Sequence, residues 1–248
     1  MYVADYLETS LLDWDGKISC VLFLSGCNFR CPWCQNRDLV LGKTANRIHI
    51  TEILQKFKDR KDWIDGFVIT GGEPTINKNL KVLISEIKNN GFTVKIDTNG
   101  SKPELLKELI LNKLVDSVAM DIKTSVEQKK YNVACGITVN LRDIIHSIDI
   151  LINSKIDCLF RTTAVPGIVD IDDIKKISEK ICGKKYTIQK FVPHNTLNKN
   201  YANLEPYSDK DMKKMEKNIS CLRKHEIIVS NAEGLRYAEV LQLCKKEG

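Results

Sequence analysis

The sequence predicts an α/β fold, specifically a partial (β/α)6 TIM-like barrel made of six strand–helix units. Short runs rich in Ile and Val alternate along the chain with amphipathic stretches, which is typical of parallel strands connected by helices. A polar motif follows or lies within each of the six strand candidates, and the C-terminal ends of parallel strands meet at one rim of a barrel. Six units are too few for a complete eight-stranded barrel. The alternatives are a partial barrel and a doubly wound sheet, and the single polar rim favours the partial barrel.

The strand candidates are short apolar runs. In chain order they are Ile18–Leu24, Gly66–Thr70, Phe92–Asp97, Ser117–Asp121, Ile156–Thr163 and Tyr186–Phe191. The polar motifs accompany them in the same order: three cysteines, TGGEP, DTNG, DIK, Arg161 and VPHN.

The helix candidates carry apolar residues at positions i, i+3 and i+4, as in the stretch 80–87. They are Thr51–Arg60, Asn79–Asn90, Pro103–Asn112, Leu141–Asn153, Ile171–Ile181, Ser208–Lys224 and Leu235–Lys245. Pro103 lies at a helix start, where its missing N–H costs nothing. Because no linker or low-complexity segment interrupts the pattern, we expect one domain over residues 1–248. Its core lies at about 15–195 and a helical C-terminal extension at about 205–248.

The composition indicates a chain with a sizeable core and no strong electrostatic bias. Of the 248 residues 43% are hydrophobic, and the net charge of +6 comes from lysines spread along the chain, so a nucleic-acid partner is not expected. The N-terminus MYVADYLETS has acidic residues where a signal peptide has basic ones, and no apolar run approaches the ~20 residues that span a bilayer. We therefore expect a cytoplasmic chain without a membrane partner, in which clustered cysteines more often bind metal or take part in catalysis than form disulfides.

Three of the nine cysteines are clustered in the stretch SGCNFRCPWCQN, namely Cys27, Cys31 and Cys34. A structural zinc site needs four ligands, and the nearest histidine is His49, 15 residues beyond the last cysteine. A thioredoxin-like pair leaves Cys27 without a role, and an electron-transfer ferredoxin cluster takes four thiolates. Three thiolates on a four-iron cluster leave one iron open to a ligand from solution. The other cysteines sit singly and are expected to be small buried hydrophobes, with a second cluster as the alternative.

With Trp33 just before its last cysteine, this C-x3-C-x2-C loop resembles the cluster loop of the radical S-adenosylmethionine (SAM) enzymes. The resemblance implies a [4Fe-4S] cluster on Cys27, Cys31 and Cys34 whose open iron is chelated by the amino and carboxylate groups of SAM. It also implies reductive cleavage of SAM to methionine and a 5′-deoxyadenosyl radical, with Trp33 among the residues that bind the cofactor.

The TGGEP motif contributes Gly71, Gly72, Glu73 and Pro74 to the expected SAM site. Adjacent glycines mark turns, so a plain strand-to-helix turn is the alternative interpretation. As part of a site, the glycines let the backbone approach a ligand without interference from a Cβ. The resemblance implies that this motif, with Glu73 as an acceptor, receives the SAM amino group.

The DTNG and DIK motifs contribute Asp97, Thr98, Asn99, Asp121 and Lys123. The resemblance to activating enzymes implies that both aspartates and the threonine surround a monovalent cation, Na+ or K+, near SAM. It further implies that the lysine helps hold the methionine carboxylate. Oxygen ligands suit a hard cation, and an ammonium beside a carboxylate donates a charge-assisted hydrogen bond. The alternatives are an Asn-Gly turn and a surface ion pair.

Two further residues are assigned to the site by resemblance. Arg161 lies in an otherwise apolar strand, where it either forms a structural ion pair or reaches the SAM ribose or carboxylate. His194, in VPHN, is either an ordinary loop histidine or a contact to the cosubstrate.

The stretch Thr9–Asn36, with VAMDIKTS, RTTAVPG and the chain up to about Val192, is similar to glycyl-radical-enzyme activating proteins. The likeness is greatest to the activator of anaerobic ribonucleoside-triphosphate reductase, with pyruvate formate-lyase activase a near second. It implies a glycyl radical enzyme as the protein substrate, a hydrogen atom removed from a glycine Cα, and a flavodoxin- or ferredoxin-like electron donor. The open side of a partial barrel would admit a loop of such a partner. A radical SAM enzyme acting on a small metabolite is the alternative, and a non-catalytic Fe–S or zinc protein a remote one.

Overall fold

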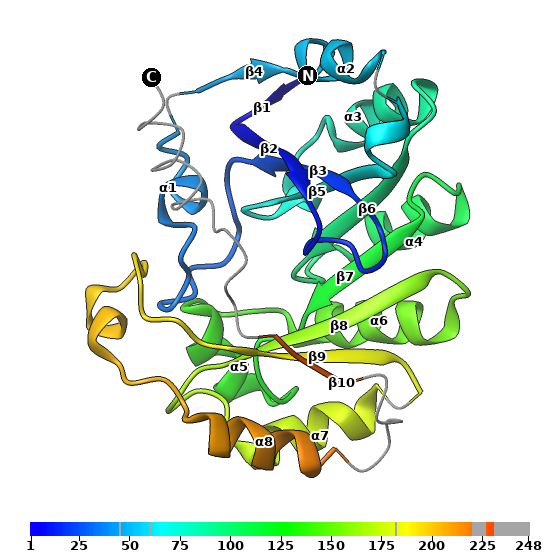
Figure 1. The fold of residues 1–248 in the computed structure, drawn as a ribbon. Helices are drawn as coiled ribbons and strands as arrows, with labels where there is room; N and C mark the ends of the chain where they lie inside the picture. The colour runs from blue at the N-terminus through cyan, green and yellow to red at the C-terminus, as the bar shows by residue number, and fades with distance from the viewer. Residues whose placement is uncertain (45, 60, 182, 220–226, 231–248) are drawn as a thin grey trace.

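The computed structural model describes residues 1–44, 46–59, 61–181, 183–219 and 227–230, which build a curved sheet with helices on its outer face (Figure 1). Eight strands form this sheet. In their order across it they are β10 (Ile227–Ser230), β9 (Lys185–Lys190), β8 (Asp157–Ala164), β7 (Ser117–Asp121), β6 (Thr93–Thr98), β5 (Gly66–Gly71), β3 (Ser19–Leu24) and β2 (Asp5–Ser10). All neighbours pair in parallel except β2, which is antiparallel to β3. The six predicted parallel strands are confirmed as β3 and β5 to β9.

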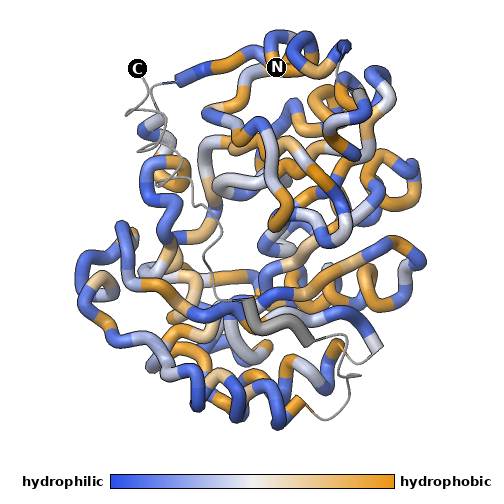
Figure 2. The backbone as a smooth tube through the Cα atoms, viewed as in Figure 1, coloured by the Kyte–Doolittle hydropathy of each residue, from blue (hydrophilic) through white to orange (hydrophobic). Residues whose placement is uncertain are grey.

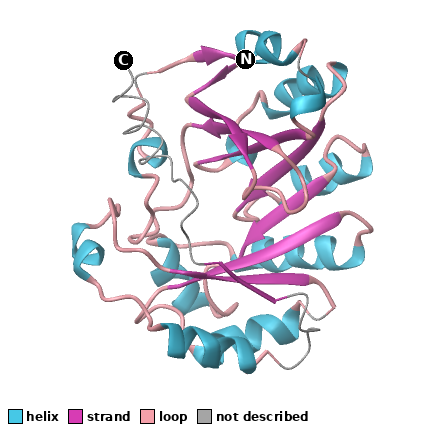
Figure 3. Cartoon of the chain, in the orientation of Figure 1, coloured by secondary structure: helices cyan, strands magenta, loops and turns pink. Residues whose placement is uncertain are grey.

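Helices connect these strands, as Figure 3 shows. They are α2 (Ile50–Phe57), α3 (Leu80–Asn89), α4 (Pro103–Leu111), α6 (Leu141–Asn153) and α7 (Ile171–Lys180). Pro103 occupies the first turn of α4, as predicted. At the start of α7, Asp170 and Asp173 form a capping box, in which each side chain accepts a hydrogen bond from the other's backbone N–H. This local pair sets the first residue of the helix.

Several elements were not predicted. They are the edge strands β2 and β10, the small antiparallel pair β1 (Tyr2–Val3) and β4 (Ile48–His49), and the helices α1 (Arg37–Val40) and α5 (Gln128–Cys135). Short 3-10 turns lie at Lys61–Trp63, Pro74–Ile76 and Lys199–Asn203. In the C-terminal extension α8 (Asp209–Lys217) is shorter than predicted, and β10 adds a strand to a segment expected to be helical. The helix predicted at Leu235–Lys245 lies outside the described residues.

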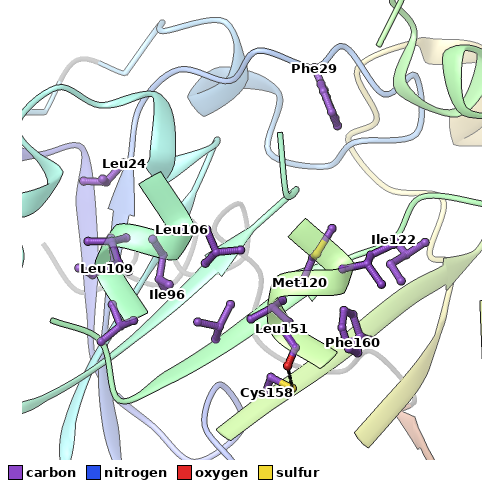
Figure 4. Close-up of a cluster of buried hydrophobic side chains, with 14 of the residues drawn as sticks. Leu24, Phe29, Ile96, Leu106, Leu109, Met120, Ile122, Leu151, Cys158 and Phe160 are labelled. Atoms are coloured by element: carbon purple, nitrogen blue, oxygen red, sulfur yellow. Dashed lines mark hydrogen bonds between the residues drawn. The ribbon is translucent and has the colours of Figure 1, made fainter. Parts of the chain in front are cut away.

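The sheet separates two apolar clusters. The larger one fills the space between the strands and the outer helices, and Figure 4 shows part of it, including Ile96, Leu106, Leu109 and Phe160. Each of these four is at most 1% exposed. Hydrophobic and hydrophilic residues alternate along α7 and α8 in Figure 2, because only one face of each helix packs on the molecule.

The inner face of the sheet is apolar at one side and charged at the other. Val21, Phe23 and Val68 form the smaller cluster with Trp14 and Leu39. Val68 pairs with Lys95 across β5 and β6, so the apolar part of the inner face lies directly beside the charged part. This inner face, rather than the outer core, therefore carries the polar chemistry.

No helix among the described residues combines the length and apolarity that a bilayer crossing requires.

Candidate functional site

The three clustered cysteines lie in the loop between β3 and α1, at the C-terminal rim of the sheet. The backbone N–H of Phe29 donates a hydrogen bond to Cys27 Sγ at 3.3 Å, and Cys34 N–H donates to Cys31 O at 3.0 Å. Burial raises the pKa of the Cys27 thiol to about 12 and that of Cys34 to about 11. These thiols keep their protons until a metal displaces them, which is how thiolate–metal sites form.

The two glycines of the TGGEP turn let it pack directly on the cysteine loop. A Cβ on Gly72 would lie 1.9 Å from Gly26 O, and one on Gly71 would lie 2.5 Å from Leu24 N. Gly71 also has a φ of +115°, which L side chains rarely adopt. Hydrogen bonds from Gly72 N–H to Leu24 O at 2.9 Å and from Glu73 N–H to Gly26 O at 2.8 Å hold the two backbones together. The close approach that these glycines permit is thus to the end of β3 for Gly71 and to the cysteine loop for Gly72.

Glu73 connects the TGGEP turn to the DTNG turn through both of its carboxylate oxygens. Oε1 accepts hydrogen bonds from the Thr75 N–H at 3.1 Å, from the Thr75 hydroxyl, and from Thr98 Oγ1 at 2.7 Å. Oε2 accepts from Asn99 N–H at 2.7 Å. The side chain is only 2% exposed; burial raises its pKa, while these donors favour the charged form. Glu73 and the following Pro74, at the start of the 3-10 turn, therefore fix the shape of the rim.

A second connection ties the cysteine loop to the DTNG turn through Asn28. Its Nδ2 donates to Ser101 Oγ at 2.8 Å, and its Oδ1 accepts from Asn99 Nδ2 at 3.0 Å. Ser101 N–H closes the ring by donating to Asn99 Oδ1 at 3.0 Å. The sequence analysis missed Asn28, whose only signal was its place directly after Cys27.

Five charged side chains form a continuous network on the inner face, across β6, β7 and β8 and one position just beyond the end of β7. Arg161 donates from Nε to Asp121 Oδ1 at 2.8 Å and from Nη1 to Asp97 Oδ2 at 3.0 Å. Lys95 Nζ lies 3.0 Å from Asp97 Oδ1, and Lys123 Nζ donates to Asp121 Oδ2 at 3.1 Å. Lys95 was missed as well, although its alternation with Val94 and Ile96 placed it on the same face as Asp97.

This network holds its carboxylates in the charged form. Burial alone would raise the pKa of Asp121, but the charges of Arg161 and Lys123 lower it to about 2. Burial likewise opposes ionisation of Asp97, and Arg161 with Lys95 outweighs it, so the pKa of Asp97 is also lowered. The pKa of Lys123 is raised, because Asp121 overcomes the effect of burial.

Trp33 joins the charged network to the cysteine loop. Lys123 Nζ lies 5.3 Å from the centroid of its ring, within the range of a cation–π contact. Among the described residues, the buried Trp33 Nε1–H has no hydrogen-bond acceptor. A buried donor without an acceptor, next to a lysine and three thiols, fits a site for a polar organic ligand.

The C-terminal end of α5 brings a fourth thiol to the cysteine loop. Arg30 N–H donates to Cys135 O at 2.8 Å, and a Cβ on Gly136 would lie 2.2 Å from Arg30 O. The Cys135 thiol lies beside that of Cys31 and, together with burial, raises the pKa of Cys31. The sequence analysis placed Cys135 among the single buried cysteines. It is buried as predicted, and so are Cys20 and Cys158.

The loop after β9 reaches across to the cysteine loop. We call residues 192–198 the clasp. Leu197 N–H donates to Cys34 O and Asn198 N–H donates to Pro32 O, both at 2.8 Å. Since the cysteine loop follows the first parallel strand and the clasp follows the sixth, these bonds bridge the rim on the open side of the barrel.

The clasp also contains His194, which is exposed. Its own N–H donates to Val192 O at 2.9 Å, and the Gln35 side chain donates to the same carbonyl. The structure therefore places His194 on the surface of the clasp, apart from the charged network.

The predicted site residues gather in two connected groups at one rim. The structure brings the cysteine loop, TGGEP and DTNG into mutual contact, and it joins Asp97, Asp121, Lys123 and Arg161 in one network. The arrangement places the three thiols beside a group of ammonium and guanidinium side chains that would attract a carboxylate.

Comparison with known sequences agrees with this arrangement. A sequence model of the radical SAM superfamily matches residues 21–181. A Methanocaldococcus jannaschii protein, named as a candidate glycyl-radical enzyme activating enzyme, is 35% identical over 227 residues, or 87% of this chain and 90% of that protein. A second protein of that organism with the same kind of name is 29% identical over 88% of this chain and 85% of its own.

Comparison with solved structures confirms the predicted fold class. Streptococcus suis SuiB, solved with its precursor peptide SuiA, is similar over 90% of this chain with a TM-score of 0.67 and 14% identity. The chain spans about half the length of SuiB. Coproporphyrinogen III oxidase from Escherichia coli, a radical SAM enzyme, is similar over 79% of this chain and 50% of its own, with a TM-score of 0.53 and 10% identity.

Proposed function

The chain belongs to the radical SAM superfamily, and on this premise we propose that it generates a glycyl radical on a partner enzyme, of which an anaerobic ribonucleotide reductase is the best candidate. One observation carries the proposal. The similarity to a protein named as a candidate activating enzyme extends over 87% of this chain and 90% of the relative, far more than the cysteine loop alone.

We assign the following roles in binding the cluster and SAM to residues of this chain. Cys27, Cys31 and Cys34 would hold the cluster, which would supply the electron that cleaves SAM into methionine and a 5′-deoxyadenosyl radical. Lys123, held at 3.1 Å from Asp121, would present its ammonium to the amino-acid carboxylate of SAM. The free Trp33 Nε1–H offers a hydrogen bond to the same ligand.

A glycine is a suitable target for this chemistry. It has no side chain, so its Cα hydrogen can approach a radical more closely than that of any other residue. The reduced state of the cluster requires a low-potential electron donor, which we propose is a flavodoxin- or ferredoxin-like protein.

A second candidate function is the modification of a small metabolite. It is favoured by a 33% identity over 86 residues with the 7-carboxy-7-deazaguanine synthase of Aquifex aeolicus, a match that covers 35% of this chain and 38% of that enzyme. Because this match is short, it supports the shared cluster chemistry more than a shared substrate.

The test uses the full chain, reconstituted with iron and sulfide without oxygen and then given SAM, a reductant and an anaerobic ribonucleotide reductase. The proposal predicts a glycine-centred doublet in the paramagnetic resonance spectrum, formed with one 5′-deoxyadenosine per radical, and no such signal with Cys31→Ala. A reductase whose radical-site glycine is changed to alanine is the matched control. If SAM is cleaved but no reductase acquires a glycine radical, the small-metabolite function is favoured.

A further inference from the structure

We propose that the guanidinium of Arg161 stands in the place that resemblance assigns to a monovalent metal cation, so that this SAM site works without Na+ or K+. The inference concerns the SAM-binding part of the proposed function and does not depend on the glycyl radical step.

The position of Arg161 follows from the register of the sheet. Asp121 on β7 pairs directly with Arg161 on β8, and Asp97 lies on the next strand, β6. From there the planar guanidinium reaches both carboxylates at once, with Nε 2.8 Å from Asp121 and Nη1 3.0 Å from Asp97. An arginine suits this bridging role because its donors diverge in a fixed fork.

The remaining carboxylate oxygens also lie beside ammonium groups. Lys95 Nζ lies 3.0 Å from the second oxygen of Asp97, and Lys123 Nζ lies 3.1 Å from the second oxygen of Asp121. Asp97 Oδ1 accepts no hydrogen bond among the described residues, so its contact with Lys95 is an ion pair alone. Each of the four oxygens therefore has a cationic nitrogen within 3.1 Å, which already balances the charge that a metal ion would meet.

The third expected ligand is turned away from the aspartates. The Thr98 hydroxyl donates to Glu73 Oε1 at 2.7 Å and accepts from Gly100 N–H at 3.1 Å. The residues present therefore do not fit the cation.

The net charge of the network also disfavours a metal cation. Arg161, Lys95 and Lys123 carry three positive charges against two negative ones, and their side chains are 15%, 4% and 13% exposed. A further cation would enter a poorly solvated site of net positive charge, where like charges repel strongly. Such a site instead attracts an anion, such as the amino-acid carboxylate of SAM.

The first experiment uses the unaltered full chain. SAM affinity of the reconstituted protein, and the thermal midpoint of the cluster-free protein, are measured in KCl, NaCl and choline chloride at equal ionic strength. We expect less than a twofold difference in SAM affinity and the same midpoint in all three salts. A saturable tightening of SAM binding by tenfold or more, or a rise in midpoint that is specific to K+ or Na+, would overturn the proposal.

The second experiment removes the guanidinium. In Arg161→Met the two aspartates face each other without their shared partner, so we expect a lower midpoint in choline chloride and a partial recovery in KCl or NaCl. Lys180→Met, which breaks a half-exposed ion pair with Asp149, is the matched control and should not respond to the choice of cation. An Arg161→Met protein as stable in choline as the unaltered chain contradicts the proposal. Should this variant not fold, the salt series on the unaltered chain decides alone.

Neither readout involves a glycyl radical. A failure to activate any reductase would therefore leave the salt result standing, and a K+-dependent SAM affinity would leave the glycyl radical proposal standing.

Discussion

Gly72 lies so close to Gly26 that a Cβ at position 72 would be 1.9 Å from the Gly26 carbonyl oxygen. The TGGEP turn and the cysteine loop therefore position each other. Resemblance assigns TGGEP to SAM binding. The contact with Gly26 is a separate, steric reason for a glycine in this motif.

This contact predicts that Gly72→Ala displaces the cysteine loop. We expect the variant to retain less than half of the iron of the unaltered protein after reconstitution and to lose most SAM cleavage, because the added methyl group can only be accommodated by a backbone shift. Gly167→Ala is the control, since its Cβ would meet nothing within 4 Å and only its positive φ is unfavourable. Equal iron content in the two variants would contradict the steric explanation.

The cysteines themselves give a second prediction. Cys27→Ala, Cys31→Ala and Cys34→Ala should each abolish SAM cleavage, because loss of a ligand opens the cluster. Cys158→Ala should leave cleavage nearly unchanged, since its buried thiol lies in the larger apolar cluster, 4.0 Å from Leu151 O (Figure 4). Cleavage is measured as 5′-deoxyadenosine, and loss of activity in Cys158→Ala would mean that the single-cluster assignment is wrong.

Asn28→Ala should loosen the cysteine loop without disturbing the fold. The substitution removes two hydrogen bonds, to Ser101 and Asn99, each of which contributes about 1 kcal/mol. We expect a small fall in thermal midpoint and a clearly faster loss of iron to a chelator. Asn90→Ala removes an exposed hydrogen bond to Glu86 O and should leave the rate of iron loss unchanged. If both variants lose iron at the same rate, Asn28 does not anchor the loop.

The charged network predicts how stability depends on pH. The pKa of Asp121 is about 2 in the folded chain, whereas an unfolded aspartate has a pKa of about 3.9. The unfolded state therefore binds more protons between these values, so this stabilisation is complete above about pH 5 and is lost as the pH falls toward 2. Because the side chain is 31% exposed, we expect a contribution of about 1–2 kcal/mol.

The measurement is denaturant unfolding of the cluster-free protein from about pH 1 to about pH 5, a range that extends about one unit beyond each of the two pKa values. Asp121→Asn should flatten the dependence on pH while lowering stability at neutral pH, because Arg161 and Lys123 lose a charged partner. An unchanged slope in Asp121→Asn would show that other carboxylates cause the loss in acid.

Much of this fold could be predicted from local patterns. The six parallel strands and the helices α2, α3, α4, α6 and α7 have strong periodicity, and α6 has the predicted bounds, Leu141–Asn153. The edge strand β2 was missed because its sequence, DYLETS, is half-exposed and lacks an apolar run. The short helix α1 has too few residues for any periodic signal.

The residues of the site also divide into those that the sequence could identify and those that it could not. Motif residues such as Asp121 and Arg161 could be identified because they stand at strand ends or interrupt an apolar strand. Asn28 could not, because its role depends on Ser101, which is far away in the sequence. Lys95 could have been identified, because strand alternation places it on the same face as Asp97, two residues away. Cys135 belongs to the same class as Asn28, since only the packing of α5 brings it to Cys31.

The proximity of Cys135 to Cys31 makes one measurement decisive for the central claim, which is that three thiolates hold the cluster and leave an iron open to SAM. The paramagnetic resonance spectrum of the reduced cluster is recorded before and after addition of SAM, in the unaltered protein and in Cys135→Ala. The account predicts that both proteins assemble the cluster and that SAM changes both spectra. A spectrum that ignores SAM in the unaltered protein, together with loss of the cluster in Cys135→Ala, would show that the fourth thiol occupies the open position.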